Sequence, residues 1–174
     1  MSQWRKDDDE WMSKLIHFCN ENEIEIIFKI HPKFKIASRE IGTRMIQEIK
    51  NKCVNLKYMI TYDMELSELL LATDLVVTDF SNVGLETMIA GKPLLSLNLF
   101  NEDWEEFHST MIHRYGASLY VENYDEFEDK ILEILKQNQH IKELKINQEK
   151  IVNRYNYFNG GKAVDRIYEQ LLTK

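Results

Sequence analysis

The sequence has no hydrophobic run that approaches the length of a membrane span. A helix that crosses a bilayer needs about 20 predominantly apolar residues, and no stretch of this chain comes near that, so no transmembrane helix is predicted. The first residues, MSQWRKDDDEW, are acidic and contain no apolar core. They therefore do not match a secretory signal or a transit peptide.

Cysteine is scarce, and basic residues are outnumbered by acidic ones. The two cysteines, Cys19 and Cys53, form no metal-ligand pair, and we expect them to be buried as free thiols in a reducing cytoplasm. The formal net charge of −7 argues against a generic nucleic-acid-binding protein, which would carry a basic face. We expect no nucleic-acid partner, no metal and no cofactor.

Two common nucleotide-binding motifs are also missing. The chain contains neither G-x-G-x-x-G nor G-x-x-x-x-G-K-[ST], so the sequence signals neither a dinucleotide fold nor a P-loop. Any nucleotide site must therefore use a different turn.

The most informative stretch runs from Leu75 to Leu97 and predicts one β-α-β crossover. Its parts are a strand at 75–77, a polar turn at 78–82, a helix at 83–90 and a strand at 94–97. Ser81 is a good N-cap for the helix. Gly91, followed by Pro93, ends it. Open α/β sheets bind ligands at such turns.

Strands and helices alternate along most of the chain. We predict a single α/β domain over 1–174, doubly wound, with a mainly parallel sheet and helices on both faces. Further strands are expected at 24–30, 56–61 and 117–121, and further helices at about 7–20, 38–49, 66–70, 123–135, 136–150 and 162–172, with Asn123 and Glu126 as a capping box. Residues 1–6 are too few and too polar to supply the strand expected before the first helix. An exposed apolar edge would follow, with marginal stability or association.

The turn and the following helix contain candidate ligand groups. Backbone N–H groups at Thr78–Asn82 suit a phosphate. Asn82 and Glu86 share a helix face, so the Glu86 carboxylate could accept from a ribose diol one turn away. The alternative is that both are ordinary exposed polar residues. Asp79 is either a base or an Asx residue that orients the turn.

His31 ends the predicted strand 24–30 and is followed by Pro32. The carboxyl end of a parallel strand is the ligand edge of the sheet, so His31 is a candidate general base or phosphate contact. A hydrogen-bonded structural histidine is the alternative.

These motifs, in this order, resemble a known family. They are Lys29-Ile30-His31-Pro32, Thr78-Asp79-Phe80-Ser81-Asn82, Glu86 with Ala90-Gly91-Lys92-Pro93, and Gly161-Lys162-Ala163 with Arg166-Ile167. From about Ile24 to Leu172 the chain resembles the C-terminal domain of GT-B-fold enzymes. It is most similar to the CDP-glycerol glycerophosphotransferases of teichoic acid synthesis, and it also resembles UDP-GlcNAc 2-epimerases through the central turn and Glu86.

The resemblance implies a nucleotide-diphosphate donor, with CDP-glycerol as the leading candidate. Its pyrophosphate would lie on Ser81 and Asn82, its ribose near Glu86, and its reacting phosphate by His31, while Lys162 would add positive charge. A polymer or lipid-linked acceptor would be bound by an N-terminal domain that this chain lacks. The implied location is cytoplasmic, with the full-length protein peripheral at the inner face of the cell membrane.

Several features depart from the related families. Thr78 stands where retaining glycosyltransferases have the first glutamate of E-x₇-E, and Asn159 stands where the teichoic-acid family often has aspartate. The first strand of the donor domain is also missing, and the isolated chain is expected to be inactive. Two further interpretations therefore stay open, namely a fragment of a UDP-sugar epimerase and a nucleotide-binding or interaction module without catalysis.

Overall fold

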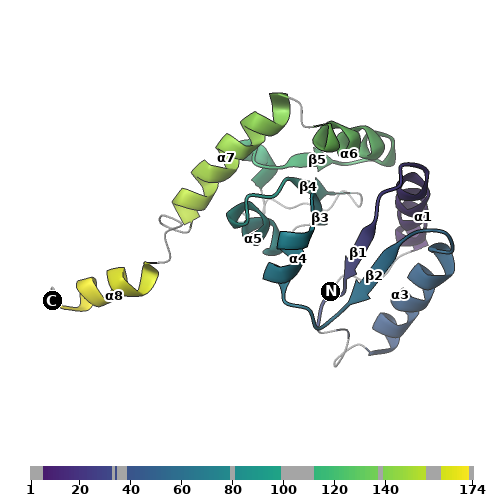
Figure 1. Ribbon diagram of the computed structural model, residues 1–174, viewed down its shortest axis with the longest axis horizontal. Helices are drawn as coiled ribbons and strands as arrows, with labels where there is room; N and C mark the ends of the chain where they lie inside the picture. The colour runs from purple at the N-terminus through teal and green to yellow at the C-terminus, as the bar shows by residue number, and fades with distance from the viewer. Residues whose placement is uncertain are drawn as a thin grey trace. The chain divides into compact units, whose positions relative to one another are not determined.

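The computed structural model describes residues 6–32, 34, 39–78, 81–98, 112–136, 139–155 and 162–172 (Figure 1). The chain divides into two compact units, Met1–Glu68 and Leu69–Lys174. Each unit combines a small parallel sheet with helices packed against it, which confirms the predicted α/β class.

Helices and short strands alternate in the predicted order. The strands are β1 (Ile26–Lys29), β2 (Tyr58–Thr61), β3 (Val76–Thr78), β4 (Leu94–Leu97) and β5 (Leu119–Val121). The α-helices are α1 (Lys6–Glu21), α3 (Arg39–Lys52), α4 (Leu66–Ala72), α5 (Val83–Ile89), α6 (Phe127–Leu135), α7 (Gln139–Tyr155) and α8 (Ala163–Leu172). Two 3₁₀ turns are described as well, η2 (Ile112–Tyr115) and η3 (Tyr124–Glu126).

The first unit is built on a parallel pair of strands. β1 and β2 align Ile26 with Tyr58 and Lys29 with Thr61. Helices α1 and α3 contact each other, and the side chain of Ile49 in α3 is only 1% exposed. This pairing places the carboxyl ends of both strands at one edge, where the chain continues into His31.

The two cysteines lie in this unit and are buried free thiols, as predicted. Burial raises the pKa of Cys19 to about 12, with a further contribution from neighbouring Cys53, and burial also raises the pKa of Cys53. Both side chains therefore act as small apolar residues in the packing of α1 and α3.

The described residues of the second unit form three parallel strands in the order β3-β4-β5. The register aligns Val76 with Leu94, and Thr78 with Ser96, which is in turn aligned with Tyr120. The crossover predicted for 75–97 is confirmed, because β3 and β4 are parallel neighbours joined through α5. The three strands run side by side in Figure 1.

Helices α5 and α7 cover one face of this sheet. They contact each other, and together with β4 they enclose a buried apolar cluster. The buried members are Met88, Leu94, Ala117, Ile151 and Val152, and Val76, Leu85 and Ile89 pack against them.

A buried glutamine ties α7 to the entrances of two strands. Gln148 is 2% exposed, and its Nε2 donates to the carbonyl of Lys92 at 3.2 Å and to the carbonyl of Ala117 at 3.0 Å. Its Oε1 has no hydrogen-bond partner among the described residues. Buried backbone carbonyls that are not paired between strands need another hydrogen-bond donor. Gln148 supplies that donor and so fixes where β4 and β5 begin.

Several element boundaries differ from the sequence-based expectations. β1, β2 and β5 are shorter than predicted, and the described part of α7 runs from Gln139 to Tyr155. Asn123 caps the 3₁₀ turn η3, where its Oδ1 accepts from the N–H groups of Asp125 and Glu126 at 3.1 and 3.2 Å. Its Nδ2 donates to Glu126 Oε1 at 2.8 Å, so the capping box is closed by side chains.

Within the described part of the second unit, β3 forms one edge of the three-stranded sheet. Val76 N–H donates to the carbonyl of Pro93 at 3.1 Å, so Val76 and Thr78 face β4, while the backbone groups of Val77 point outward. All three side chains of β3 are half-buried, and none is charged. Proteins usually block such edges with charges, proline or bulges.

We therefore predict that the isolated chain associates through strand edges as its concentration rises. Val77→Pro should reduce this association, because it removes an outward N–H and leaves the ladder with β4 intact. The matched control, Val76→Pro, should instead lower the unfolding free energy by about 3 kcal/mol, because it removes a ladder donor. Sedimentation velocity over a range of concentrations, with urea unfolding of each variant, measures both effects. A wild-type chain that stays monomeric at high concentration would contradict the prediction.

Candidate functional site

The turn between β3 and α5 is stabilised by Ser81. Helix α5 begins at Val83, and Asn82 before it already has helical backbone angles, φ −57° and ψ −20°, with no capping bond from its own side chain. Ser81 Oγ accepts a hydrogen bond from Val83 N–H at 3.3 Å. The capping oxygen predicted for Ser81 is therefore present, one residue before the N-cap position.

Most N–H groups in the first turn of α5 are occupied. Gly84 N–H donates to the Ser81 carbonyl at 2.9 Å, and Leu85 N–H donates to the Asn82 carbonyl at 3.0 Å. Within the described ranges, no hydrogen bond is formed by the backbone N–H groups of Ser81 and Asn82. These two groups are thus the donors of the turn that a bound anion can use.

Glu86 lies one helical turn beyond Asn82. Its N–H donates to the Asn82 carbonyl at 3.3 Å, and its side chain is exposed. Thr78, at the end of β3, is half-buried. The structure therefore brings Thr78, Ser81, Asn82 and Glu86 together on one strand–turn–helix unit. Asp79 lies outside the described residues.

The far end of α5 is closed as the sequence predicts. Gly91 has a positive φ of +68°, and its N–H donates to the Met88 carbonyl at 2.9 Å. Lys92 Nζ donates to the carbonyl of Thr73 at 2.8 Å, at the end of the segment before β3. The Lys92 side chain therefore ties the C-terminal end of the short helix to the segment before β3.

A polar row beside this turn was not predicted from the sequence. Ser96 and Ser118 are each 5% exposed, and their hydroxyl oxygens lie 3.0 Å apart. Asn98, 8% exposed, follows β4 and donates from Nδ2 to the Tyr120 hydroxyl at 2.9 Å. The sequence did contain a signal for this row. Polar residues stand at alternate positions of two apolar segments, Ser96 and Asn98 in one and Ser118 and Tyr120 in the other, and alternate positions share one face of a sheet.

The environment of Tyr120 is only partly polar. Burial raises the pKa of Tyr120, and a hydrogen bond and charge from Glu122 act in the same direction. The hydrogen bond from Asn98 and the charge of Arg114 oppose this rise. The phenol therefore stays protonated at neutral pH and serves as a neutral donor and acceptor at the carboxyl end of β5.

His31 belongs to the first unit and follows β1. Its side chain is exposed, and its carbonyl accepts a hydrogen bond from Phe34 N–H at 3.0 Å. Lys29, two residues earlier, donates from Nζ to the carbonyl of Tyr62 at 2.6 Å. His31 therefore lies on a turn at the end of a parallel strand with its side chain exposed, and its catalytic role stays a prediction.

Lys162 directly precedes α8. Its side chain is exposed, and its carbonyl accepts from Arg166 N–H at 3.1 Å. No hydrogen bond or ion pair among the described residues joins the Lys162 side chain to the turn before α5. Its contribution to a donor site stays a prediction.

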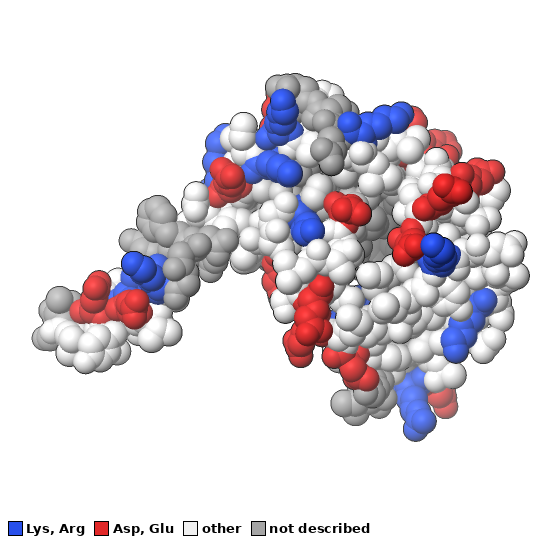
Figure 2. All heavy atoms as spheres, viewed as in Figure 1, with Lys and Arg blue, Asp and Glu red and all other residues white. Residues whose placement is uncertain are grey.

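Charged side chains of both signs are mixed on the face drawn in Figure 2, which shows no continuous basic surface in that view. Within the described ranges, no group of three His, Cys, Asp or Glu side chains is arranged to hold a metal ion. No described helix combines the length and the apolar content that crossing a bilayer requires.

A comparison with protein families gives a match over nearly the whole chain. The model of the CDP-glycerol:poly(glycerophosphate) glycerophosphotransferase family matches residues 4–173. This chain belongs to that glycerophosphotransferase family. The resemblance noted from the motifs is thereby confirmed over nearly the whole chain. Neither the curated proteins nor the solved structures contain a match.

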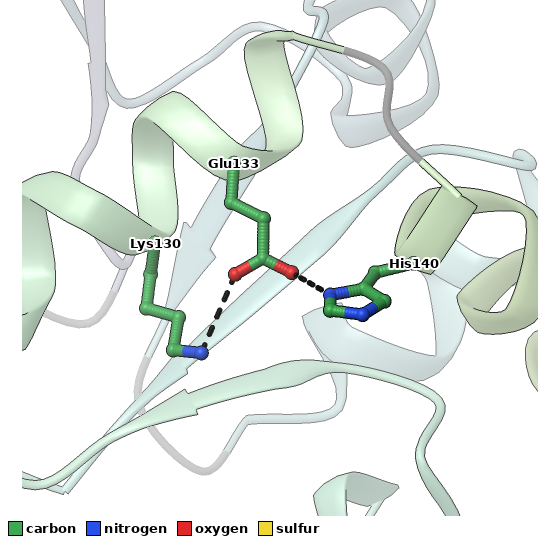
Figure 3. A network of polar contacts seen from close by, with 3 residues as sticks. All are labelled: Lys130, Glu133 and His140. Carbon is green, nitrogen blue, oxygen red and sulfur yellow. Dashed lines mark hydrogen bonds and ion pairs between the residues drawn. The ribbon is translucent and has the colours of Figure 1, made fainter.

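This glycerophosphotransferase-family chain also contains an ion-pair cluster between α6 and α7. His140 Nδ1 lies 2.6 Å from Glu133 Oε1, and Lys130 Nζ lies 3.4 Å from Glu133 Oε2 (Figure 3). Burial raises the pKa of the Glu133 carboxyl, but the hydrogen bond from His140 and the charge of Lys130 outweigh burial and lower that pKa overall. The cluster clamps the two helices and lies outside the predicted site.

We predict that this clamp contributes to stability above about pH 5 and not at strongly acidic pH. The folded-state pKa of Glu133 is lowered, so its contribution is present above the unfolded value of about 4.3 and is lost as the pH falls through the folded value. Glu133→Gln should lower the unfolding free energy by about 1 kcal/mol at neutral pH and by little near pH 3. Urea unfolding at several pH values tests this, with the exposed Glu143→Gln in α7 as the control. An equal loss at every pH would contradict the assignment.

Proposed function

We propose that this chain is the donor-binding part of an enzyme that transfers glycerophosphate from CDP-glycerol to a poly(glycerophosphate) acceptor. The family match over residues 4–173 is the observation that carries the proposal. The process served would be the synthesis of teichoic acid or a related surface polymer. An N-terminal domain would bind the acceptor, and the full-length protein would lie at the inner face of the cell membrane.

The donor would bind at the turn between β3 and α5. Its pyrophosphate would accept hydrogen bonds from the N–H groups of Ser81 and Asn82, which make no other hydrogen bond within the described ranges. Glu86, exposed one turn away, would accept from the ribose hydroxyls. Thr78 would line the entry to this turn, and Lys162 would add positive charge near the phosphates.

His31 is the proposed general base. A hydroxyl of the acceptor attacks the phosphorus that carries glycerol, a new phosphorus–oxygen bond forms, and the bond to the CMP phosphate oxygen breaks. The imidazole takes the hydroxyl proton as the attack proceeds, and CMP leaves with the electron pair. The exposure of His31 and the hydrogen bond between its carbonyl and Phe34 support this role, because the ring must be both accessible and positioned.

We predict that Glu86→Gln weakens CDP-glycerol binding by about 1–2 kcal/mol, roughly 5- to 30-fold in Kd, through loss of charge-assisted hydrogen bonds. Stability should barely change, because the side chain is exposed. Calorimetric titration with CDP-glycerol, CDP, UDP and UDP-GlcNAc measures the affinities. Glu143→Gln, also exposed, is the matched control.

Each outcome of this titration has a clear meaning. Preference for CDP-glycerol supports the glycerophosphotransferase assignment, and preference for UDP-GlcNAc would favour a sugar-nucleotide epimerase instead. Binding of nucleotides without turnover in the full-length protein would favour a binding module without catalysis. Unchanged affinity in folded Glu86→Gln would remove Glu86 from the donor site.

We predict that His31→Ala lowers turnover in the full-length enzyme by about 10²–10⁴-fold, the usual range for a lost acid–base group. Donor affinity should change much less, because the turn and Glu86 remain. Turnover per folded molecule, with CDP-glycerol affinity determined in parallel, is the decisive measurement. A purely structural histidine would instead lower stability, with activity falling only in proportion to the folded fraction.

A further inference from the structure

Helix α3 has a glycine, Gly42, in its first turn, where glycine does not stabilise the helix. Glycine in a helix interior costs about 1 kcal/mol relative to alanine. Gly42 is nevertheless buried in this helix. A buried helical glycine usually marks a close approach of another part of the chain.

The close approach at Gly42 is made by Phe34 and Tyr62. A Cβ added at Gly42 would lie 2.8 Å from the Phe34 carbonyl oxygen, 3.0 Å from Phe34 Cβ and 3.0 Å from the Tyr62 hydroxyl. Non-bonded carbon atoms prefer about 3.5–4.0 Å. The shortest of these contacts is to backbone, so an alanine at this position would have to displace the chain at Phe34 or the helix itself.

The displaced backbone is joined to the candidate base. Phe34 N–H donates to the His31 carbonyl at 3.0 Å, so the two residues close one turn. The core side of α3 is anchored by Ile49, which is 1% exposed. The helix is therefore the firmer partner, and the turn takes up most of any displacement.

A second contact supports the same arrangement. Lys29 Nζ donates to the Tyr62 carbonyl at 2.6 Å, and it leaves β1 two residues before His31. Tyr62 thus lies between Lys29 and Gly42, with its hydroxyl beside the glycine. Gly42, Tyr62 and Lys29 form a support for the turn that carries His31, and we call these three residues the turn support.

We propose that Gly42 is a positioning residue for His31: the missing side chain admits the Phe34 carbonyl and so sets where the imidazole stands. The proposal rests on the general-base role given to His31 above. It assigns the glycine a role in turnover although it touches neither substrate nor the reacting atoms. It also gives Lys29 a structural purpose, because its amine is committed to the Tyr62 carbonyl.

The test compares Gly42→Ala with Thr43→Ala, the exposed neighbour in the same helix. The ring resonances of His31 are followed in ¹³C-histidine-labelled chain and assigned with His31→Gln. Turnover and CDP-glycerol affinity are measured in the full-length enzyme. We expect Gly42→Ala to shift the His31 resonances and to lower kcat about 5- to 50-fold, since misplacement of a catalytic group by about 1 Å can cost 10²-fold. Donor affinity should stay unchanged, and Thr43→Ala should change neither property.

A second variant protects the test against misfolding of Gly42→Ala. Lys29→Met keeps the length of the side chain but removes its hydrogen bond to Tyr62. We expect it to shift the same resonances and to lower kcat in the same direction, by a smaller factor. If Gly42→Ala does not fold, unchanged resonances and unchanged kcat in Lys29→Met overturn the proposal.

Failure of this inference differs from failure of the proposed function. Folded Gly42→Ala with unchanged His31 resonances and normal kcat overturns the positioning role, while a strong loss in His31→Ala keeps the general-base role. Normal kcat in His31→Ala overturns the general base. In that case the positioning proposal fails as well, because it rests on the general-base role of His31.

Discussion

Burial of β4 on both faces is the constraint on which the second unit depends. Leu94 and Leu95 point to opposite faces and are both 0% exposed, so both faces of the sheet must be covered. Parallel pairing on each side then fixes the register and aligns Thr78 with Ser96, and Ser96 with Tyr120. A register shift of one residue would move every side chain of the strand to the opposite face of the sheet. The free-energy cost of such a shift fixes the position of the turn before α5 relative to the strands.

Polar groups inside this unit add specificity to the apolar packing. Thr87 is 0% exposed, and its hydroxyl donates to the Val83 carbonyl at 2.7 Å, so the hydroxyl is satisfied within α5. The Ser96–Ser118 pair is satisfied across two strands, and Gln148 satisfies two carbonyls at the strand entrances. Buried polar groups are costly when unpaired, so each of these pairs favours a single arrangement of strands and helices.

Each unit, taken by itself, contains a local feature that supports the proposed function. The second unit holds the turn with two N–H groups that have no other described acceptor, which suits an anionic donor. The first unit holds the exposed imidazole on a turn that is backed by Gly42 and Lys29. A phosphotransferase needs its base placed accurately and its donor bound firmly, and these demands fall on different local structures here.

The sequence determined the β-α-β crossover, the end of α5 at Gly91, the burial of both cysteines and the family, because each depends on local periodicity, on backbone preferences of single residues or on motif order. It also located Ser81 and Asn82 in the turn before α5, Glu86 one turn further along that helix and His31 directly after a strand. Only the tertiary structure showed which N–H groups of the turn already donate a hydrogen bond. A shift of one residue in the start of α5 would change that set. The Asn98–Tyr120 pair and the contact of Gly42 with Phe34 were likewise decided in three dimensions. Both depend on how separate elements pack against each other, and no local sequence pattern encodes that packing.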